Sequence, residues 1–149
     1  MIKEVAHKII DTLPYGKDFL FVDSISYVDS ERIIGHYTFK KDAFFYESHF
    51  KHLHIIPGVI IIEMMGQIGL VCHQVYLQNL YNSDTIYHPL LSNLEAEFFR
   101  EVFPDEKLTV ISNRIYLRHG ILKSKTELYN QKDELCCRTV AQIKIILNS

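Results

Sequence analysis

Residues 55–71 read IIPGVIIIEMMGQIGLV, and this stretch decides the fold. A Pro-Gly break leads into an apolar run in which Glu63 and Gln67 are the only strongly polar side chains. Proline suits the first position of a helix, because its missing N–H would have no partner there. We therefore expect a helix from Pro57 to about Leu80, roughly 35 Å long at 1.5 Å per residue. Apolar residues lie nearly all the way round it, so other elements should cover most of its surface.

The two polar side chains of this helix form a candidate catalytic pair. Glu63 and Gln67 are four residues apart, so they share one face and can hydrogen-bond each other. Burying an isolated carboxylate is costly, because the protein interior disfavours the charged form. Proteins tolerate that cost mostly where a perturbed acid is useful. Glu63 is thus a candidate acid that Gln67 orients, although a carboxyl that is paired only to satisfy it is the plain structural alternative.

The size and composition describe one globular domain, residues 1–149. The apolar fraction is 48%, the charged fraction is 23% and the net charge is −2, which argues against nucleic-acid binding. A membrane span is not expected, because the apolar run is short and holds Pro57, Glu63 and Gln67. The first residues lack the pattern of a signal peptide.

The cysteines indicate a reducing compartment. Cys72, Cys136 and Cys137 form no disulfide framework, and a cytoplasmic location fits them best. Cys136 and Cys137 are adjacent in a predicted strand, so their side chains should point to opposite faces of the sheet.

The rest of the chain is predicted to be one short helix followed mainly by strands. The expected helix is Ile2–Ile10, and the expected strands are Phe19–Val28, Arg32–Phe39, Leu108–Leu117, Ile121–Tyr129 and a last strand that buries Cys137, Thr139, Ala141, Ile143, Ile145 and Leu147 on one face. Asp42–His54 is expected to be an irregular loop. These elements predict an α+β domain in which an antiparallel sheet wraps around one long central helix.

The helix and the loop before it carry a family resemblance. The chain resembles the hot-dog-fold 3-hydroxyacyl-(acyl-carrier-protein) dehydratases of type II fatty acid synthesis, and most closely their FabZ-like branch. Their signature reads H-F-P-G-x-P-x-M-P-G-V-L-x-x-E-A-M-A-Q, and the residues that match it without a gap are His49, Phe50, Pro57, Gly58, Val59, Glu63, Met65 and Gln67.

Further likeness covers most of the chain, from Leu13 to Leu147. Residues 13–23 resemble the family's L-P-H-x-x-P-F-L-L-V-D opening, and residues 96–108 resemble its A-x-F-x-R-x-V-x-P-G-D-x-L segment. The departures gather near the histidine loop, where Lys51-His52 replaces Pro-Gly and His54 replaces Pro. Tyr15 stands where the family has a histidine.

The resemblance implies a hot-dog fold and a reaction that converts 3-hydroxyacyl thioesters to trans-2-enoyl thioesters. A neutral imidazole is a suitable base for the C2 proton, which we assign to His49. The thioester oxygen gains charge, and the backbone N–H of Gly58, next to Val59 at the helix N-terminus, is a natural donor to it. Glu63 then protonates the departing hydroxyl, directly or through water.

The resemblance also implies partners. The substrate arrives on acyl carrier protein, and His49 and Glu63 of one site come from different subunits of a homodimer, which could assemble further into an oligomer of dimers. No cofactor or metal is expected. The carrier is acidic, so a basic patch is expected at the mouth, and its candidates are Lys40, Lys41, Lys51, Arg100, Arg114 and Arg118.

Aromatic and apolar residues near the site are weaker candidates. They are expected to line the acyl pocket, although aromatic clusters are more often simply core. These residues are Phe45, Tyr46, Phe50, Ile56 and Pro57. His49, His52 and His54 with Glu63 could suggest a metal site, but their spacing is undiagnostic.

Two other functions stay open. A hot-dog thioesterase would use the same helix N-terminus as an oxyanion donor and a carboxylate to activate water. Alternatively, the altered loop at Lys51-His52 could mark a catalytically weakened subunit that binds acyl chains beside an active paralogue. The fold does not decide among these functions. Retention of both His49 and Glu63 favours an active dehydratase, and a glutamate rather than an aspartate favours the dehydratase-only branch.

Overall fold

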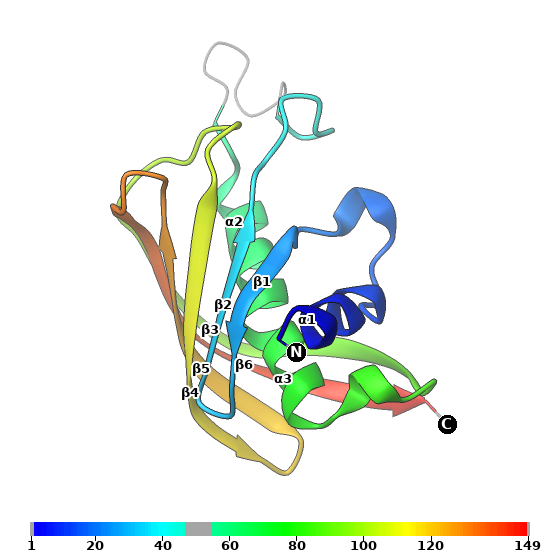
Figure 1. Cartoon of the computed structure of the whole chain (residues 1–149). Helices are drawn as coiled ribbons and strands as arrows, with labels where there is room; N and C mark the ends of the chain where they lie inside the picture. The colour runs from blue at the N-terminus through cyan, green and yellow to red at the C-terminus, as the bar shows by residue number, and fades with distance from the viewer. Residues whose placement is uncertain (1, 47–54, 149) are drawn as a thin grey trace.

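The computed structural model describes residues 2–46 and 55–148, and in it a curved antiparallel sheet encloses a long helix (Figure 1). Among these residues the sheet has six strands in the order β1-β2-β4-β5-β6-β3. Their bounds are β1 Ser24–Val28, β2 Arg32–Tyr37, β3 Ile86–Phe98, β4 Leu108–Arg118, β5 Ile121–Tyr129 and β6 Leu135–Asn148. The predicted α+β architecture, with the sheet wrapped around one central helix, is confirmed.

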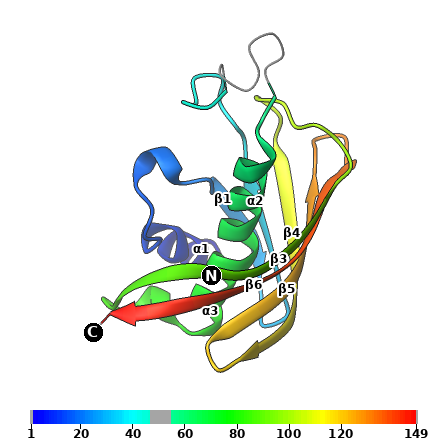
Figure 2. The same cartoon turned by 180° about the vertical axis from the view of Figure 1, so that it is seen from behind.

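The central helix runs without a break from Gly58 to Leu77. It consists of α2 (Gly58–Gly66), a π-helical segment (Gln67–Val71) and α3 (Cys72–Leu77). Pro57 is the N-cap rather than the first helical residue, and the helix ends before the expected Leu80 because Asn79 adopts a left-handed conformation, with φ 56°. The helix is long and apolar enough to cross a membrane, with a mean hydropathy of 1.4 over an 18-residue stretch, but 67% of that stretch is buried inside the protein. Figures 1 and 2 show why: the strands curve around it.

Two glycines let the helix approach the sheet closely. A Cβ on Gly69 of the helix would lie 2.9 Å from Cγ2 of Thr126 on β5, and a Cβ on Gly35 of β2 would lie 2.5 Å from Cγ2 of Ile68. On the sheet surface that faces Gly69, the hydroxyls of Ser112 and Thr126 hydrogen-bond each other at 2.8 Å. Small side chains at this crossing therefore bring the helix axis close to the sheet.

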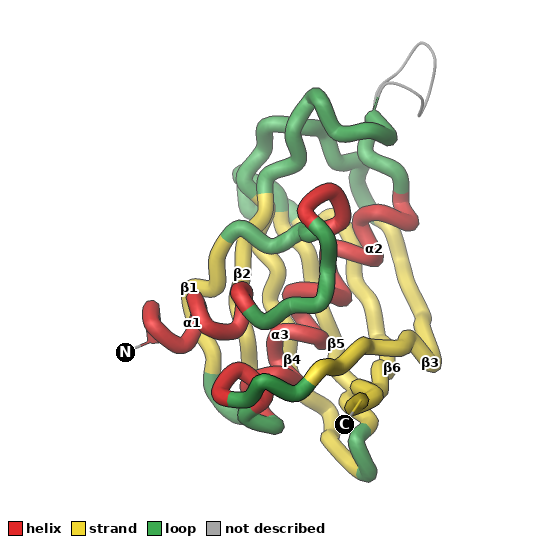
Figure 3. Tube along the Cα trace, turned by 90° about the vertical axis from the view of Figure 1, so that its right-hand side faces the viewer, coloured by secondary structure: helices red, strands yellow, loops and turns green. Residues whose placement is uncertain are grey.

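The amino-terminal part of the chain covers the helix on the side that the sheet leaves open. α1 (Ile2–Asp11) agrees with the predicted helix and buries Ala6 and Ile9. The segment after α1, which includes a short 3₁₀ helix (Lys17–Phe19), then lies over the central helix (Figure 3).

Three sequence-based expectations differ from the structure in detail. β1 begins at Ser24 and not at Phe19, because the backbone of residues 19–21 bonds to a helix side chain instead of to a strand. On β6 the alternation holds through Ile145, but Leu147 is 50% exposed where the sheet ends. Cys136 is buried together with Cys137 at a point where the pairing of β5 with β6 is irregular: Leu128 pairs with Cys137 and Tyr129 with Leu135. The N–H groups of Phe99 and Arg100 donate to the Cys136 carbonyl.

The two ends of the barrel-like sheet differ. Residues 38–46, 99–107 and 130–134 gather around the helix N-terminus, whereas the β1–β2 and β4–β5 turns lie at the opposite end (Figure 1). At that opposite end the His73 Nε2–H donates to the Asp29 carbonyl at 2.8 Å, and the Gln74 Nε2–H donates to the Gly120 carbonyl at 2.8 Å. The helix thus bonds directly to both turns.

Candidate functional site

The site begins at the N-terminus of the central helix, where backbone N–H groups lack helical partners. Pro57 caps the helix with an extended backbone, and its carbonyl accepts from Ile60 N at 3.0 Å and Ile61 N at 3.1 Å. The N–H groups of Gly58 and Val59 precede these two bonds, and no described residue accepts from them. With the helix dipole, they can stabilise negative charge on a ligand oxygen.

The carboxylate of Glu63 lies one to two turns further along the helix. Its side chain is half-buried, and its Oε2 accepts a hydrogen bond from Gln67 Nε2 at 2.9 Å. The predicted contact between these two residues is present. The carboxylate is less enclosed than the sequence suggested, because it borders a cavity rather than packed side chains.

Gln67 is fully buried and fixed by three hydrogen bonds. Its Oε1 accepts from Phe21 N at 2.8 Å, and its Nε2 donates to the Phe19 carbonyl at 2.9 Å as well as to Glu63. One amide therefore holds the segment after α1 on the helix and also holds one oxygen of Glu63. This amide explains why residues 19–21 do not join the sheet.

A cavity of about 560 Å³, here called the inner cavity, lies beside Glu63 between the helix, β3, β6 and the segment after α1. Its walls are mostly apolar, as expected for a pocket that holds a hydrocarbon chain. The lining residues are Pro14, Tyr15, Phe19, Val59, Ile62, Glu63, Gly66, Leu70, Val71, His88, Pro89, Leu91, Leu94, Thr139, Ala141 and Ile143.

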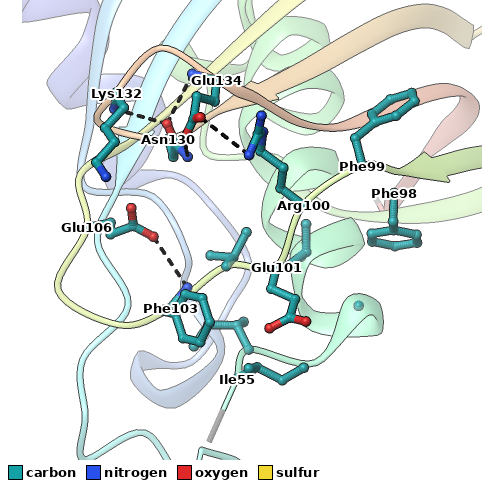
Figure 4. A pocket seen from close by; sticks show the side chains of 14 residues that line it. Ile55, Phe98, Phe99, Arg100, Glu101, Phe103, Glu106, Asn130, Lys132 and Glu134 are labelled. Atoms are coloured by element: carbon teal, nitrogen blue, oxygen red, sulfur yellow. Dashed lines mark hydrogen bonds and ion pairs between the residues drawn. The ribbon is translucent and has the colours of Figure 1, made fainter.

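A second cavity of about 790 Å³, here called the rim cavity, opens next to Gly58 (Figure 4). Gly58 and Ile61 of the helix line it, and the Phe98 ring lies against Gly58, since a Cβ on Gly58 would lie 3.2 Å from Phe98 Cζ. Ile55 and Ile56 also line it, so the chain reaches the helix N-terminus along this cavity. Its polar wall is internally bonded: Arg100 pairs with Glu134 at 3.3 Å, and Asn130 Nδ2 donates to Glu134 Oε1 at 2.9 Å.

The expected base lies outside the described residues. His49 and Phe50 fall within residues 47–54, and so do Lys51, His52 and His54. The pairing of His49 with Glu63 therefore stays a prediction.

The remaining expected lining residues fall in different surroundings. Ile56 borders the rim cavity, and Pro57 is buried at the helix cap. Phe45 packs in an aromatic cluster, with ring centroids 5.9 Å from Phe39 and 6.4 Å from Phe21, and borders neither cavity. Tyr46 is half-buried and also borders neither cavity.

Most of the described candidates for a basic patch have a partner, and Lys51 lies outside the described residues. Lys41 pairs with Asp105 at 3.5 Å, Arg114 with Glu31 at 2.7 Å, and Arg118 lies over the Tyr116 ring at 4.5 Å. The described lining of the rim cavity contains two cations and three carboxylates, which are Arg100, Lys132, Glu101, Glu106 and Glu134.

Sequence reasoning missed several residues of the inner cavity. Tyr15 carried a usable signal, because it replaces a family histidine. The β3 residues carried none, since Leu91 and Leu94 reach the cavity only through the pairing of β3 with β6.

Burial raises the pKa of Tyr15, and the charge of nearby Glu63 adds to that shift, so its phenol stays neutral.

Comparison with known proteins agrees with this geometry. The family model for a FabA-like domain matches residues 13–134. The 3-hydroxyacyl-(acyl-carrier-protein) dehydratase FabZ of Wolbachia pipientis subsp. Culex pipiens is 32% identical over 135 residues, covering 89% of this chain and 90% of that protein. The FabZ of Petrotoga mobilis is 32% identical over 140 residues, covering 93% and 95%. The chain belongs to the FabA-like family, as its sequence predicted.

Solved structures share the fold. The dehydratase heterocomplex ApeI:P from Xenorhabdus doucetiae aligns with a TM-score of 0.73 at 15% identity, covering 91% of this chain and 89% of that one. A hypothetical thioesterase from Streptococcus pneumoniae, solved with coenzyme A, aligns with a TM-score of 0.64 at 9% identity, covering 99% and 98%. These identities are too low to carry more than the hot-dog architecture.

Proposed function

We propose that this protein dehydrates 3-hydroxyacyl thioesters carried on acyl carrier protein to trans-2-enoyl thioesters. The observation that carries the proposal is the arrangement on one helix of N-terminal N–H groups, the Glu63 carboxylate and a mostly apolar cavity beside it. The relatives named 3-hydroxyacyl-(acyl-carrier-protein) dehydratase support the same reaction. The pathway is fatty acid synthesis or a related chain-building route in the cytoplasm.

In the proposed mechanism, His49 removes the C2 proton of the substrate as a general base. The thioester oxygen then gains negative charge, and the N–H groups of Gly58 and Val59 donate to it at the positive end of the helix dipole. Glu63 in its protonated form delivers a proton to the C3 hydroxyl, which leaves as water. The C2–C3 double bond forms, and proton exchange through that water returns both side chains to their starting states.

Gln67 fixes the orientation of the Glu63 carboxyl group. It donates to Oε2, so Oε1 is the oxygen that we expect to meet the substrate hydroxyl. The amide is held by two backbone bonds, and its position therefore does not depend on the substrate.

We also propose a homodimer that pairs through β3. This strand ends the sheet, and in the described chain it pairs only with β6. Edge strands are usually short, charged or covered, because their open backbone groups recruit other strands. β3 is 13 residues long and exposes large apolar side chains, namely Ile86, Leu90, Leu91, Leu94 and Phe98. Val59 of the helix, 73% exposed, adds to the same surface.

The reaction is tested by following the hydration of a short enoyl group on acyl carrier protein through the loss of enoyl absorbance. We expect turnover by the unmodified protein and a loss of roughly a hundredfold or more in His49→Ala and in Glu63→Gln, as expected for losing a general base or acid. Glu4→Gln on α1 is the matched control and should leave the rate unchanged. Release of free thiol instead of hydration would establish a thioesterase. A folded protein that turns over neither way would establish a non-catalytic partner.

The shared site is tested by mixing the two inactive variants. If each site takes His49 from one subunit and Glu63 from the other, a mixed dimer of His49→Ala and Glu63→Gln contains one intact site. Random exchange then restores activity at roughly a quarter of all sites in a two-fold dimer. No restoration after verified subunit exchange would contradict a site shared in this way.

A further inference from the structure

The inner cavity has a direction that two separate elements define. Its helix wall extends from Val59 to Val71, about 18 Å at 1.5 Å per residue. Its β3 wall extends from Leu94 back to His88, about 20 Å at the spacing of a strand. Because Phe98 contacts Gly58, the later end of β3 lies at the helix N-terminus. The earlier end of β3 therefore marks the far end of the cavity.

Tyr15 lines the inner cavity on the segment after α1. Just before it, this segment is bonded to Tyr87, which directly precedes His88, the lining residue at the far end of the β3 wall. Just after it, the segment is bonded to Gln67, one turn from Glu63 on the helix. These two attachments place Tyr15 between Glu63 and the far end of the cavity.

The backbone on both sides of Tyr15 is tied down. Before it, the Thr12 carbonyl accepts from the Tyr87 hydroxyl at 2.9 Å. After it, the Gly16 carbonyl accepts from Phe19 N at 3.0 Å, and Gln67 binds the Phe19 carbonyl. The ring itself packs against Phe19, with centroids 6.4 Å apart. These contacts hold the segment that carries Tyr15 against β3 and the helix.

A substrate with its thioester at Gly58 and its C3 at Glu63 must extend its acyl tail away from the helix N-terminus. We propose that Tyr15 sets the length of acyl chain that this protein accepts, by closing the inner cavity beyond Glu63. This assignment rests on the proposed dehydration. It concerns the size of the ring and not the chemistry of its hydroxyl. A longer chain meets the phenol ring before its carbonyl reaches the helix N-terminus, so the cost appears as a lower kcat/KM for long chains.

The test compares kcat/KM for crotonyl, octenoyl and dodecenoyl groups on acyl carrier protein in the unmodified protein, Tyr15→Ala, Tyr15→Leu and Tyr15→Phe. We expect the ratio of dodecenoyl to crotonyl values to rise at least roughly tenfold in Tyr15→Ala, the scale on which an apolar pocket discriminates by size. Tyr15→Leu should move the ratio the same way, and it keeps an apolar side chain in case the alanine variant unfolds. Tyr15→Phe should leave the ratio within about threefold, which is small on that scale.

A substitution that disturbs Glu63 lowers kcat/KM for both substrates alike, because both use the same acid. The ratio of the two values therefore isolates the effect of chain length. Tyr27→Ala, which removes a tyrosine from β1 outside both cavities, is the matched control. An unchanged ratio in both the alanine and leucine variants would overturn the assignment, and so would an equal shift in Tyr15→Phe. Turnover of any chain length by the unmodified protein supports the dehydration itself, so the two proposals fail separately.

Discussion

The two ends of the central helix have opposite roles. At the N-terminal end, Gly58 and Val59 present backbone donors beside two cavities, and the nearby carboxylate is only half-buried. At the other end, His73 and Gln74 are fully buried and bond to the turns of two hairpins. Polar groups that bond to backbone carbonyls stabilise the fold, and polar groups left facing a cavity are available to a substrate. One helix therefore carries the candidate site at one end and contacts that stabilise the fold at the other.

Gln67 combines both roles, because it bonds to backbone groups and also to Glu63, so its removal should have the largest combined effect. In Gln67→Leu the Phe21 N–H and the Phe19 carbonyl lose their partner, and we expect a loss of about 2–3 kcal/mol in the free energy of unfolding. The released Glu63 should also lower kcat by roughly tenfold or more, the range of a mispositioned catalytic group. Denaturant titration and enoyl hydration measure the two effects. A variant that loses stability and keeps its kcat would show that Glu63 needs no orienting amide.

His73 tests the structural end alone. His73→Leu removes the donor to the Asp29 carbonyl in a buried setting, and we expect a loss of about 2 kcal/mol in stability. The kcat of the folded fraction should not change, because the side chain lies at the opposite end of the helix from Gly58. A fall in kcat with unchanged stability would contradict the separation of the two ends.

The pH dependence of stability refines that comparison. Burial lowers the pKa of His73, and the charge of Arg114 lowers it further, while the Asp29 carbonyl and the charges of Asp29 and Glu31 oppose the shift. The unfolded state then takes up a proton first as the pH falls below about 6.5, the ordinary histidine value. The contribution of the neutral imidazole is complete above that pH and is lost progressively below it.

Urea titrations between neutral and mildly acidic pH measure this loss. We expect the unmodified protein to lose more stability on acidification than His73→Gln, since glutamine has no proton to bind. Burial also lowers the pKa of His36, but this residue is the same in both proteins. Its contribution therefore cancels in the difference between their pH profiles. Parallel pH profiles would exclude His73 as the source.

The smallest effect is expected at the surface of the structural end. Arg114 Nη2 pairs with Glu31 at 2.7 Å, but Glu31 is 68% exposed. Ion pairs of this kind contribute about 0–1 kcal/mol, so Arg114→Gln should change stability by less than about 1 kcal/mol. A larger loss in thermal or chemical denaturation would mean that this pair anchors the β1–β2 turn.

Local sequence patterns predicted the elements that depend on near neighbours. The central helix, expected from Pro57 to about Leu80 and found at Gly58–Leu77, follows from the Pro-Gly break and the apolar run after it. The hydrogen bond from Gln67 to Glu63 and the inward face of β6 through Ile145 follow from the periods of a helix and a strand. The gapless match to the signature also identified the family correctly. These features depend on residues a few positions apart, which a sequence displays directly.

Long-range contacts explain what the patterns missed. Residues 19–21 look like the start of a strand, but Gln67, 46 to 48 positions away, takes their backbone bonds. The π-helical segment at Gln67–Val71 has no periodic signal of its own. Cys136 is buried where the pairing of β5 with β6 is irregular, which a strand pattern does not show.

By itself, the sequence determined that one apolar helix with a single carboxylate lies inside an antiparallel sheet, and that the chain belongs to the FabA-like family. Only the tertiary structure decided which residues surround that carboxylate. The inner cavity combines residues from the segment after α1, the helix, β3 and β6. Such a cavity exists only after strand pairing and helix packing have joined distant parts of the chain, so its shape, with Tyr15 between Glu63 and its far end, is a property of the folded molecule.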